Sequence, residues 1–438
     1  MSILSKEEAK KILAKALSFS KADDCIVTLN GSDSGNVRYA RNTITTSGVR
    51  STMTLGVQSS FGKKTGTTTI TEFDDQSLEK VIRRSEELAR LSPENPEYMP
   101  PLGPQQYKDT PTFVKSTADI TPEYRAKVAA DSIGPAAKKD VTAAGFLNDS
   151  AGFNAMMNSK GLFAFNQSTN LSFSVTMRTN DGTGSGWVTR DYNDVKKFNS
   201  ATASQISLDK ALLSRKPKAI EPGKYTVILE PVAAEALIGN MISNMGARQA
   251  DEGRSFLAKK GGGNKLGEKL VDERITIYSD PWNKEVPSAS WDGNGQPIQK
   301  MSWIEKGVVK NMFYSRYWAK KKGKIYTPAP SNGIMLGGSA SIQDMIKSTK
   351  KGVLVTRLWY IRSVDPQTLL YTGLTRDGTF YIENGKIKFP VKNFRFNESP
   401  VIMLNNLEEL GQQQRVNGNL VPAMKIRDFT FTSLSDAI

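Results

Sequence analysis

The chain has 438 residues, of which 38% are hydrophobic and 24% charged, and its formal net charge is +15. It contains no histidine and a single cysteine, Cys25. These counts exclude intrachain disulfides, imidazole-based acid–base catalysis and zinc sites built on histidine, and they favour a reducing, cytoplasmic compartment. No apolar run approaches the roughly 20 residues that a bilayer-spanning helix needs, and the first eight residues are typical of a helix start rather than of a signal peptide.

The first part of the chain is predicted to combine helices with antiparallel strands. Ser5 and Glu8 have the spacing of a capping box, and apolar residues follow at helical intervals up to Leu17. Alternating apolar and polar residues then predict four strands, at 26–30, 37–45, 51–61 and 65–71. A second helix is expected at about 77–90.

Prolines crowd residues 92–104 and predict an extended connector near 92–110. Thr121 and Pro122 have the residue types of an N-cap and a first helical position, so a third helix begins there. Strands are then expected at 141–147, 161–165, 171–179 and 186–189, before a helix that ends near Arg215.

A domain boundary is predicted in the proline- and glycine-containing segment 216–223, which gives an N-terminal domain over 1–218 and a C-terminal domain over 219–438. A strand at 225–230 leads into a helix that begins at Pro231 and is apolar nearly all round, so we expect it to be buried. The remainder is mostly β, with predicted strands at 274–278, 298–304, 308–314, 353–362, 379–383, 386–391 and 424–432. Asn384-Gly385 is a strong hairpin signal because a type I′ turn needs positive φ at both positions. The predicted fold class is α+β: an α/β N-terminal domain of antiparallel strands with flanking helices, and a β-rich C-terminal domain.

The residues alone offer weak candidates for chemistry. The glycine-rich segment 261–267 lacks the spacing of a phosphate-binding or dinucleotide-binding loop and predicts a mobile surface loop. Asp251 and Glu252, together with Glu230 and Glu235, could be imagined as oxygen ligands of a hard cation, although their spacing matches no known metal loop. Cys25 is expected to be a small buried residue. The basic clusters, at 320–324 and at Lys347, Lys350 and Lys351, are interpreted as solvated lysines in preference to a nucleic-acid site.

Several segments, taken in order, resemble the TldD/PmbA family, which was formerly described as modulators of DNA gyrase. The similarity covers nearly the whole chain and rests on motifs that are weak singly but specific in this order. They are Tyr39-Ala40-Arg41-Asn42 followed by Gly48, residues 222–229, Ser255-Phe256-Leu257 with 266–269, residues 304–310, and 380–387 followed by Pro390-Val391.

This resemblance implies where a metal site would lie. Members of the TldD branch carry His-Glu-x-x-x-His on the helix after the strand at 222–229, together with a distant Cys, and these residues hold a metal for peptide hydrolysis. In this chain the two histidine positions are Glu235 and Asn240, and the glutamate position is Ala236. No catalytic residue, metal ligand or cofactor carries over.

The chain is therefore similar to the TldE (PmbA) branch, which implies a non-catalytic, metal-free subunit of a cytosolic TldD/TldE-type peptidase complex. Its expected partner is a TldD-type metallopeptidase in a heterodimer, with a homodimer as an alternative, and its expected substrates are peptides or unfolded proteins. Glu235 and Asn240 are candidate residues of the chamber wall. Two other hypotheses stay open: a basic protein that binds nucleic acid or gyrase, and a peptidase with a carboxylate-only metal site at Glu230, Glu235 and Asp251.

Overall fold

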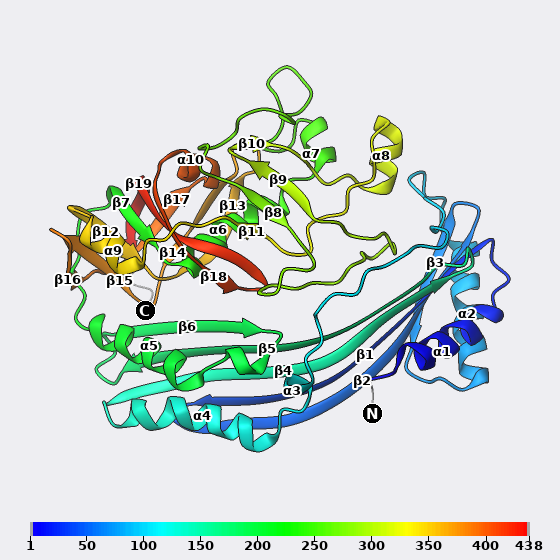
Figure 1. The fold of residues 1–438 in the computed structure, drawn as a ribbon, viewed down its shortest axis with the longest axis horizontal. Helices are drawn as coiled ribbons and strands as arrows, with labels where there is room; N and C mark the ends of the chain where they lie inside the picture. Colours follow the sequence, from blue (N-terminus) through cyan, green and yellow to red (C-terminus); the bar gives the residue numbers. More distant parts are fainter. Residues whose placement is uncertain (1–2, 436–438) are drawn as a thin grey trace.

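The computed structural model of the chain describes residues 3–435, whose strands form one sheet of six strands and one of 13. Figure 1 shows the first sheet as a long, curved layer and the second sheet, with most of the later helices, stacked above it. The fold class is α+β, as predicted. The predicted boundary near residue 218 falls on the connection between the two sheets, and the domain division itself stays a prediction.

The first sheet is antiparallel throughout, in the order β3-β2-β1-β4-β5-β6. Four of its strands, β1, β2, β4 and β5, have 17 to 19 residues and are much longer than an average strand of about five or six. The strands of this sheet are β1 (Asp24–Ala40), β2 (Thr43–Phe61), β3 (Lys64–Ile70), β4 (Val141–Asn158), β5 (Phe163–Thr179) and β6 (Ser185–Tyr192).

The predicted strands at 26–30 and 37–45 have the wrong bounds. One strand, β1, contains residues 26–40 and ends before a turn at Arg41-Asn42, and residues 43–45 already belong to β2. The segment between the two predicted strands, Gly-Ser-Asp-Ser-Gly, has poor β propensity. It is nevertheless extended because β1 is central and pairs with β2 on one side and β4 on the other. Gly35 has a packing role here, since a Cβ at this position would overlap the Arg125 guanidinium.

Helices cover one face of the first sheet. The Ser5–Glu8 capping box and the Thr121 N-cap are present, as predicted. Odd-numbered apolar residues of β1 and β4 face these helices. They pack against α1 and α2 in one core and against α4 and α5 in a second core. The helices of this part are α1 (Lys6–Ser18), α2 (Asp75–Leu91), α3 (Lys115–Ala118), α4 (Pro122–Ala137) and α5 (Ser200–Leu213), with a 3-10 turn η1 (Val195–Lys197). The opposite face turns toward the second sheet, where Met156 and Ala164 pack with Trp291.

The second sheet is mixed, with parallel pairs β7–β12 and β11–β19 among antiparallel ones. Asn384 and Gly385 have φ of 50° and 74°, so the predicted hairpin turn is confirmed. The strands are β7 (Gly223–Leu229), β8 (Ile277–Ser279), β9 (Met301–Glu305), β10 (Val308–Val309), β11 (Ile334–Met335), β12 (Lys351–Val355), β13 (Leu358–Asp365), β14 (Leu370–Thr375), β15 (Thr379–Glu383), β16 (Lys386–Pro390), β17 (Asn393–Glu398), β18 (Leu407–Val416) and β19 (Asn419–Ser435).

The strand predicted at 308–314 is wrong beyond Val309. Phe313 and Tyr314 instead bridge to two different segments, at Gly246 and Thr327, so this stretch leaves the sheet. The Phe313 side chain lines three neighbouring clefts.

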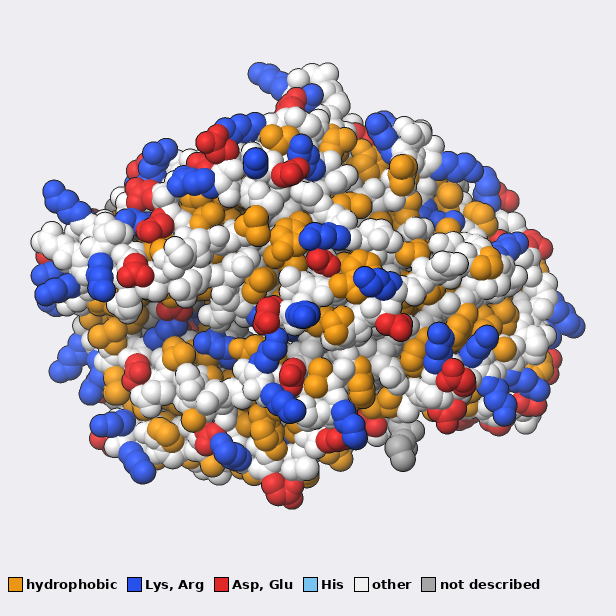
Figure 2. Space-filling view, viewed as in Figure 1, with side chains coloured by type: hydrophobic (Ala, Val, Ile, Leu, Met, Phe, Trp, Pro, Cys, Tyr) orange, Lys and Arg blue, Asp and Glu red, His pale blue; other side chains and the backbone are white. Residues whose placement is uncertain are grey.

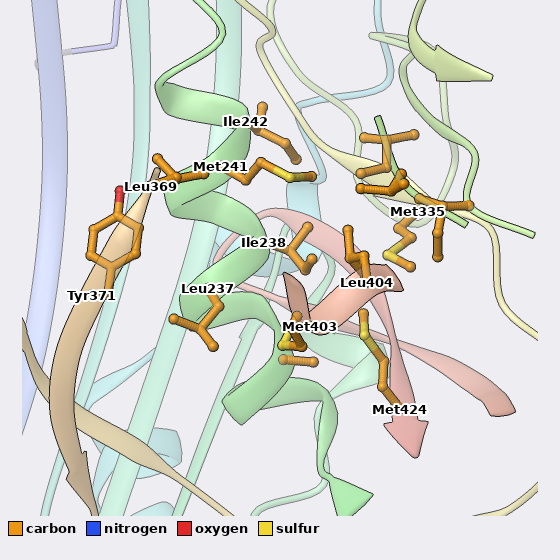
Figure 3. Close-up of a cluster of buried hydrophobic side chains, with 14 of the residues drawn as sticks. Leu237, Ile238, Met241, Ile242, Met335, Leu369, Tyr371, Met403, Leu404 and Met424 are labelled. Carbon is orange, nitrogen blue, oxygen red and sulfur yellow. The ribbon is translucent and has the colours of Figure 1, made fainter. Parts of the chain in front are cut away.

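The helices of the second part are α6 (Pro231–Ser243), α7 (Ala247–Asp251), α8 (Arg316–Lys322), α9 (Ile342–Lys347) and α10 (Pro400–Asn405). Helix α6 lies at the centre of the largest core, and Figure 3 shows its apolar side chains packed against methionine and leucine side chains of β11, α10 and β19. The predicted burial of α6 is confirmed. Within residues 3–435 no helix combines the length and apolarity needed to cross a bilayer.

Candidate functional site

One flank of α6 is not covered by the core and lines an open cleft. Successive residues of this flank are one and three positions apart, which places them on one side of a helix. They are Glu235, Ala236, Gly239, Asn240 and Ser243. The two residues predicted from the sequence as chamber-lining, Glu235 and Asn240, thus share this cleft.

The cleft has a volume of about 830 Å³. Its other walls are the segment 329–333, Phe313, Ile361 of β13 and the turn between β18 and β19. The space is large enough for several residues of an extended polypeptide, because ligand pockets for drug-sized molecules span about 300–1,000 Å³.

Glu235 is the one ionisable side chain of this cleft, and it is 9% exposed. Asn419 Nδ2 donates to its Oε1 at 3.0 Å, and Asn417 Nδ2 donates to its Oε2 at 3.2 Å. Burial raises the pKa of Glu235 and the nearby Asp191 adds to that effect, whereas the two amide hydrogen bonds lower the pKa; the net direction is upward.

The neighbours of Glu235 on α6 leave room for its carboxylate. A Cβ at Gly239 would lie 2.8 Å from Glu235 Oε1, so the glycine permits the carboxylate to lie along the helix. Asn240 Nδ2 donates to the carbonyl of Ala236 at 2.6 Å, a bond within the helix itself.

The turn that holds Glu235 also contacts the first sheet. Val416 pairs with Asn419, and the two residues between them, Asn417 and Gly418, have φ of 51° and 75°, as in a type I′ turn. The Gly418 N–H donates to Asp191 Oδ2 at 2.9 Å. This turn therefore connects α6 with the end of β6.

Arg415 reinforces the same connection, with a side chain that is 8% exposed. Its Nε donates to Asp191 Oδ2 at 2.9 Å, and its Nη1 donates to Asn193 Oδ1 at 2.8 Å. Sequence reasoning missed this turn and Arg415, although the Asn417-Gly418 dipeptide between alternating residues is the signal that could have found the hairpin.

The three carboxylates considered for a metal have separate partners. Glu230 pairs with Lys210 at 2.6 Å, and Asp251 accepts from Asn264 Nδ2 at 2.6 Å and from Trp318 Nε1 at 2.8 Å. Over residues 3–435 no three His, Cys, Asp or Glu side chains gather closely enough to hold a metal ion. Three residues stand where a metal site would need ligands and a base. Glu235 offers a carboxylate that already accepts two amide hydrogen bonds, Ala236 offers no ligand atom, and Asn240 offers only a side-chain amide. This set does not fit a catalytic divalent cation.

The remaining sequence candidates lie outside the cleft. Residues 261–263 form an exposed turn with positive φ throughout, closed by a bridge between Ala258 and Asn264. Cys25 is buried, as predicted, and burial raises the pKa of its thiol, which opposes a role as a nucleophile.

The basic run at 320–322 ends α8. The Lys321 and Lys322 ammonium groups lie 4.9 and 5.1 Å from the centre of the Trp318 ring, so both lysines cover an aromatic side chain. On the face shown in Figure 2, basic and acidic side chains are interspersed and do not form a continuous basic surface.

Two domain families of known proteins match the chain. The PmbA/TldA metallopeptidase C-terminal domain matches residues 222–433, and the PmbA/TldA metallopeptidase domain 1 matches residues 27–89. A curated relative, the metalloprotease PmbA of Escherichia coli O157:H7, is 23% identical and aligns over 97% of this chain and 98% of its own length.

Solved structures have the same fold at low sequence identity. The crystal structure of TldE from Thermococcus kodakarensis matches with a TM-score of 0.86 and 18% identity, over 98% of this chain and 100% of that one. A Bacteroides thetaiotaomicron protein named as a candidate modulator of DNA gyrase matches with a TM-score of 0.85 and 21% identity, over 98% and 99% of the two chains.

Proposed function

Because the chain belongs to the PmbA/TldD metallopeptidase family, we propose that it is a metal-free member of the TldE type. In this proposal it is the non-catalytic subunit of a cytoplasmic complex with a TldD-type metallopeptidase, and the complex cleaves peptides or unfolded proteins. The name metalloprotease belongs to the Escherichia coli relative, and the proposal does not assign peptidase activity to this chain alone.

The observation that carries the proposal is the set of side chains on the open flank of α6. A hydrolytic zinc centre uses three protein ligands and a general base for the metal-bound water. This flank offers one carboxylate, Glu235, whose two oxygens accept from Asn417 and Asn419. Ala236 and Asn240 supply neither a ligand of the usual type nor a base. The proposed contribution of this chain is therefore to binding and not to bond cleavage.

An unpaired strand edge supports the binding of extended polypeptide. Within residues 3–435, β13 pairs with β14 alone, and Ile361 of β13 lines the cleft. A bulge between Trp359 and Arg362, with Tyr360 at φ 54°, interrupts the β13–β14 register at this point. An added strand binds mainly through its backbone, which suits substrates of many sequences.

Co-purification with a TldD-type protein from the same genome tests the proposal. We expect a stable complex that hydrolyses an unfolded polypeptide, with activity that a chelator removes. Replacing one histidine of the partner motif abolishes the activity, whereas Glu235→Gln in this chain does not. Chelator-sensitive hydrolysis by this chain alone would contradict the proposal, and the mass of the purified complex distinguishes a heterodimer from a homodimer.

The two other hypotheses have less support. The carboxylate-only peptidase needs Glu230, Glu235 and Asp251 together, and each has other partners. A nucleic-acid-binding protein needs a basic surface, and the affinity of such a protein falls steeply with salt. A DNA titration at low and at physiological salt measures this directly.

A further inference from the structure

A second cleft adjoins the first and contains an arginine that has no hydrogen-bond or salt-bridge partner among residues 3–435. This second cleft has a volume of about 740 Å³, and it shares Phe313 and Ala329 with the cleft along α6. Its walls come from both sheets: Gln58 and Thr65 of β2 and β3 and the segment 95–99 on one side, and residues 292–294, 313–317 and 326–329 on the other. Figure 1 shows α8 near the end of the first sheet that carries β3.

Arg316 is the first residue of α8, and its partly buried side chain lines this second cleft. Among residues 3–435 its guanidinium has no hydrogen-bond acceptor and no carboxylate within ion-pair distance. Burial lowers the pKa of Arg316, which reflects the cost of removing this charge from water. Removing a charge from water has a cost that a ligand of opposite charge can offset, so a partly buried guanidinium that lines a cleft is a candidate binding group.

The carboxylates of the same cleft are already engaged. Glu97 pairs with Arg248 at 2.9 Å. Asp292 accepts from the Tyr326 hydroxyl and from the backbone N–H groups of Asn294 and Gln296, the latter two at 2.9 Å. Asp292 is close enough to attract Arg316 electrostatically, but its oxygens accept hydrogen bonds from other groups and not from the guanidinium.

The chemistry of Arg316 favours a carboxylate as the missing group. A guanidinium presents its N–H donors as a planar fork that matches the two oxygens of a carboxylate. Tyrosine rings at positions 98, 314, 317 and 326 surround the cleft and can pack against the apolar part of a side chain or chain end.

We propose that Arg316 binds a carboxylate of the polypeptide that occupies the cleft along α6. The inference rests on the proposed function and makes it more specific: the subunit favours polypeptides with an acidic side chain or a free C-terminus where the chain passes into the second cleft. Arg316 is then a specificity-determining residue and takes no part in bond cleavage.

Fluorescence anisotropy with matched peptides tests this inference. The full chain, in complex with its TldD-type partner and with chelator present to prevent hydrolysis, is titrated against labelled 12-residue peptides of Ala, Val, Thr and Ser. One series compares Glu with Gln at each position in turn, and another compares a free C-terminus with an amide. The first series detects an acidic side chain and the second detects the chain end.

We expect the acidic form in one series to bind about tenfold more tightly than its neutral match, since a charge-assisted hydrogen bond is worth that much. Arg316→Gln should remove the preference without changing affinity for the neutral peptides, and Arg316→Lys should restore part of it. Arg84→Gln, at an exposed arginine of α2, is the control and should change neither.

The possible results distinguish a failure of the inference about Arg316 from a failure of the proposed function. If neutral and acidic peptides bind the unsubstituted complex equally, or if Arg316→Gln keeps the preference, the inference about Arg316 is wrong and the proposed function stands. If no peptide binds at all, the proposed function fails together with the inference. Because the comparison of peptides uses unsubstituted protein, the result does not depend on whether a variant folds.

Discussion

Asn419 donates its side-chain amide to Glu235 at 3.0 Å, so a turn of the second sheet holds the one carboxylate on the open flank of α6. The side-chain oxygen of Asn419, Oδ1, also accepts from the Gly333 N–H at 2.7 Å, which fixes the orientation of this amide. The carboxylate is therefore held by hydrogen bonds from a turn of its own chain. Its neighbour on the same turn, Gly418, extends the contact to Asp191 of the first sheet.

The first prediction concerns the pH dependence of stability. Because burial raises the pKa of Glu235, the folded state binds a proton more tightly than the unfolded state does. The stabilisation by that proton is complete below the ordinary glutamate value of 4.5 and is lost as pH rises through the higher folded pKa. Glu235→Gln should therefore be less sensitive to pH above 4.5, as measured by urea unfolding at several pH values.

Glu87→Gln, at an exposed glutamate of α2, is the matched control and should follow the unsubstituted chain at every pH. An identical pH profile for Glu235→Gln and the unsubstituted chain would show that Glu235 titrates normally. That result would also show that burial does not raise the pKa of Glu235.

The second prediction concerns the contact between the two sheets. Asp191→Asn leaves the Arg415 guanidinium, which is 8% exposed, without its carboxylate. Breaking a buried ion pair at one partner costs about 3–5 kcal/mol, and the partial exposure of this pair puts the expected loss at the lower end. Denaturant unfolding measures the free energy, and Asp209→Asn, at an exposed position of α5, is the control. A loss as small as that of the control would mean that the turn is held by its own hairpin.

The third prediction compares two helical glycines. Gly134 of α4 has open space around it apart from its chain neighbour Pro135, whose ring disfavours a Cβ on the preceding helical residue, so Gly134→Ala should raise the free energy of unfolding by at most about 0.5–1 kcal/mol. Gly239→Ala gains the same helix propensity, but its Cβ would lie 2.8 Å from Glu235 Oε1 and displace the carboxylate from Asn419. We expect its gain to be smaller or absent. Equal stabilisation of the two variants would show that the carboxylate moves freely.

Local signals in the sequence predicted the five long helices but not the short helices α3, α7, α8, α9 and α10. The Ser5–Glu8 capping box, the Thr121 N-cap and the apolar surface of α6 each depend on neighbouring residues, and all three are present. Strand lengths depend on distant partners instead. The segment between 31 and 35 is extended only because β2 and β4 flank it, and neither pairing can be read from its own residues.

The candidate site was predictable in part for the same reason. The position of Glu235 and Asn240 on one helix follows from their spacing, and the resemblance to a known family indicated which helix to consider. The amides that hold Glu235 come from Asn417 and Asn419, more than 180 residues away, and only the antiparallel β18–β19 pair places them there. Arg316 had no sequence signal beyond its charge, since its significance lies in the absence of a partner within residues 3–435.

The fourth prediction tests the packing at the centre of the first sheet. The Arg125 guanidinium forms a bidentate pair with Asp149, at 2.7 and 2.8 Å, and both side chains are at most 7% exposed. Gly35→Ala would place a methyl group in the volume of that guanidinium, and overpacking of this kind costs about 1–3 kcal/mol. Gly48→Ala, on the neighbouring strand with open space around it, should change the free energy of unfolding by much less. Equal effects would show that the sheet bends to accommodate the methyl group.

The last prediction concerns metal ions. A ligand that binds only the folded state stabilises it by about 2.7 kcal/mol when its concentration is 100 times its Kd. With one carboxylate on the open flank of α6 and two amides bonded to it, zinc or manganese has no set of ligands there, so neither ion should raise the Tm of this chain, and a chelator should not lower it. The TldD-type partner, measured under the same conditions, is the positive control. Stoichiometric metal that remains after gel filtration, and that Glu235→Gln releases, would place an ion on α6 and overturn the assignment of a non-catalytic subunit.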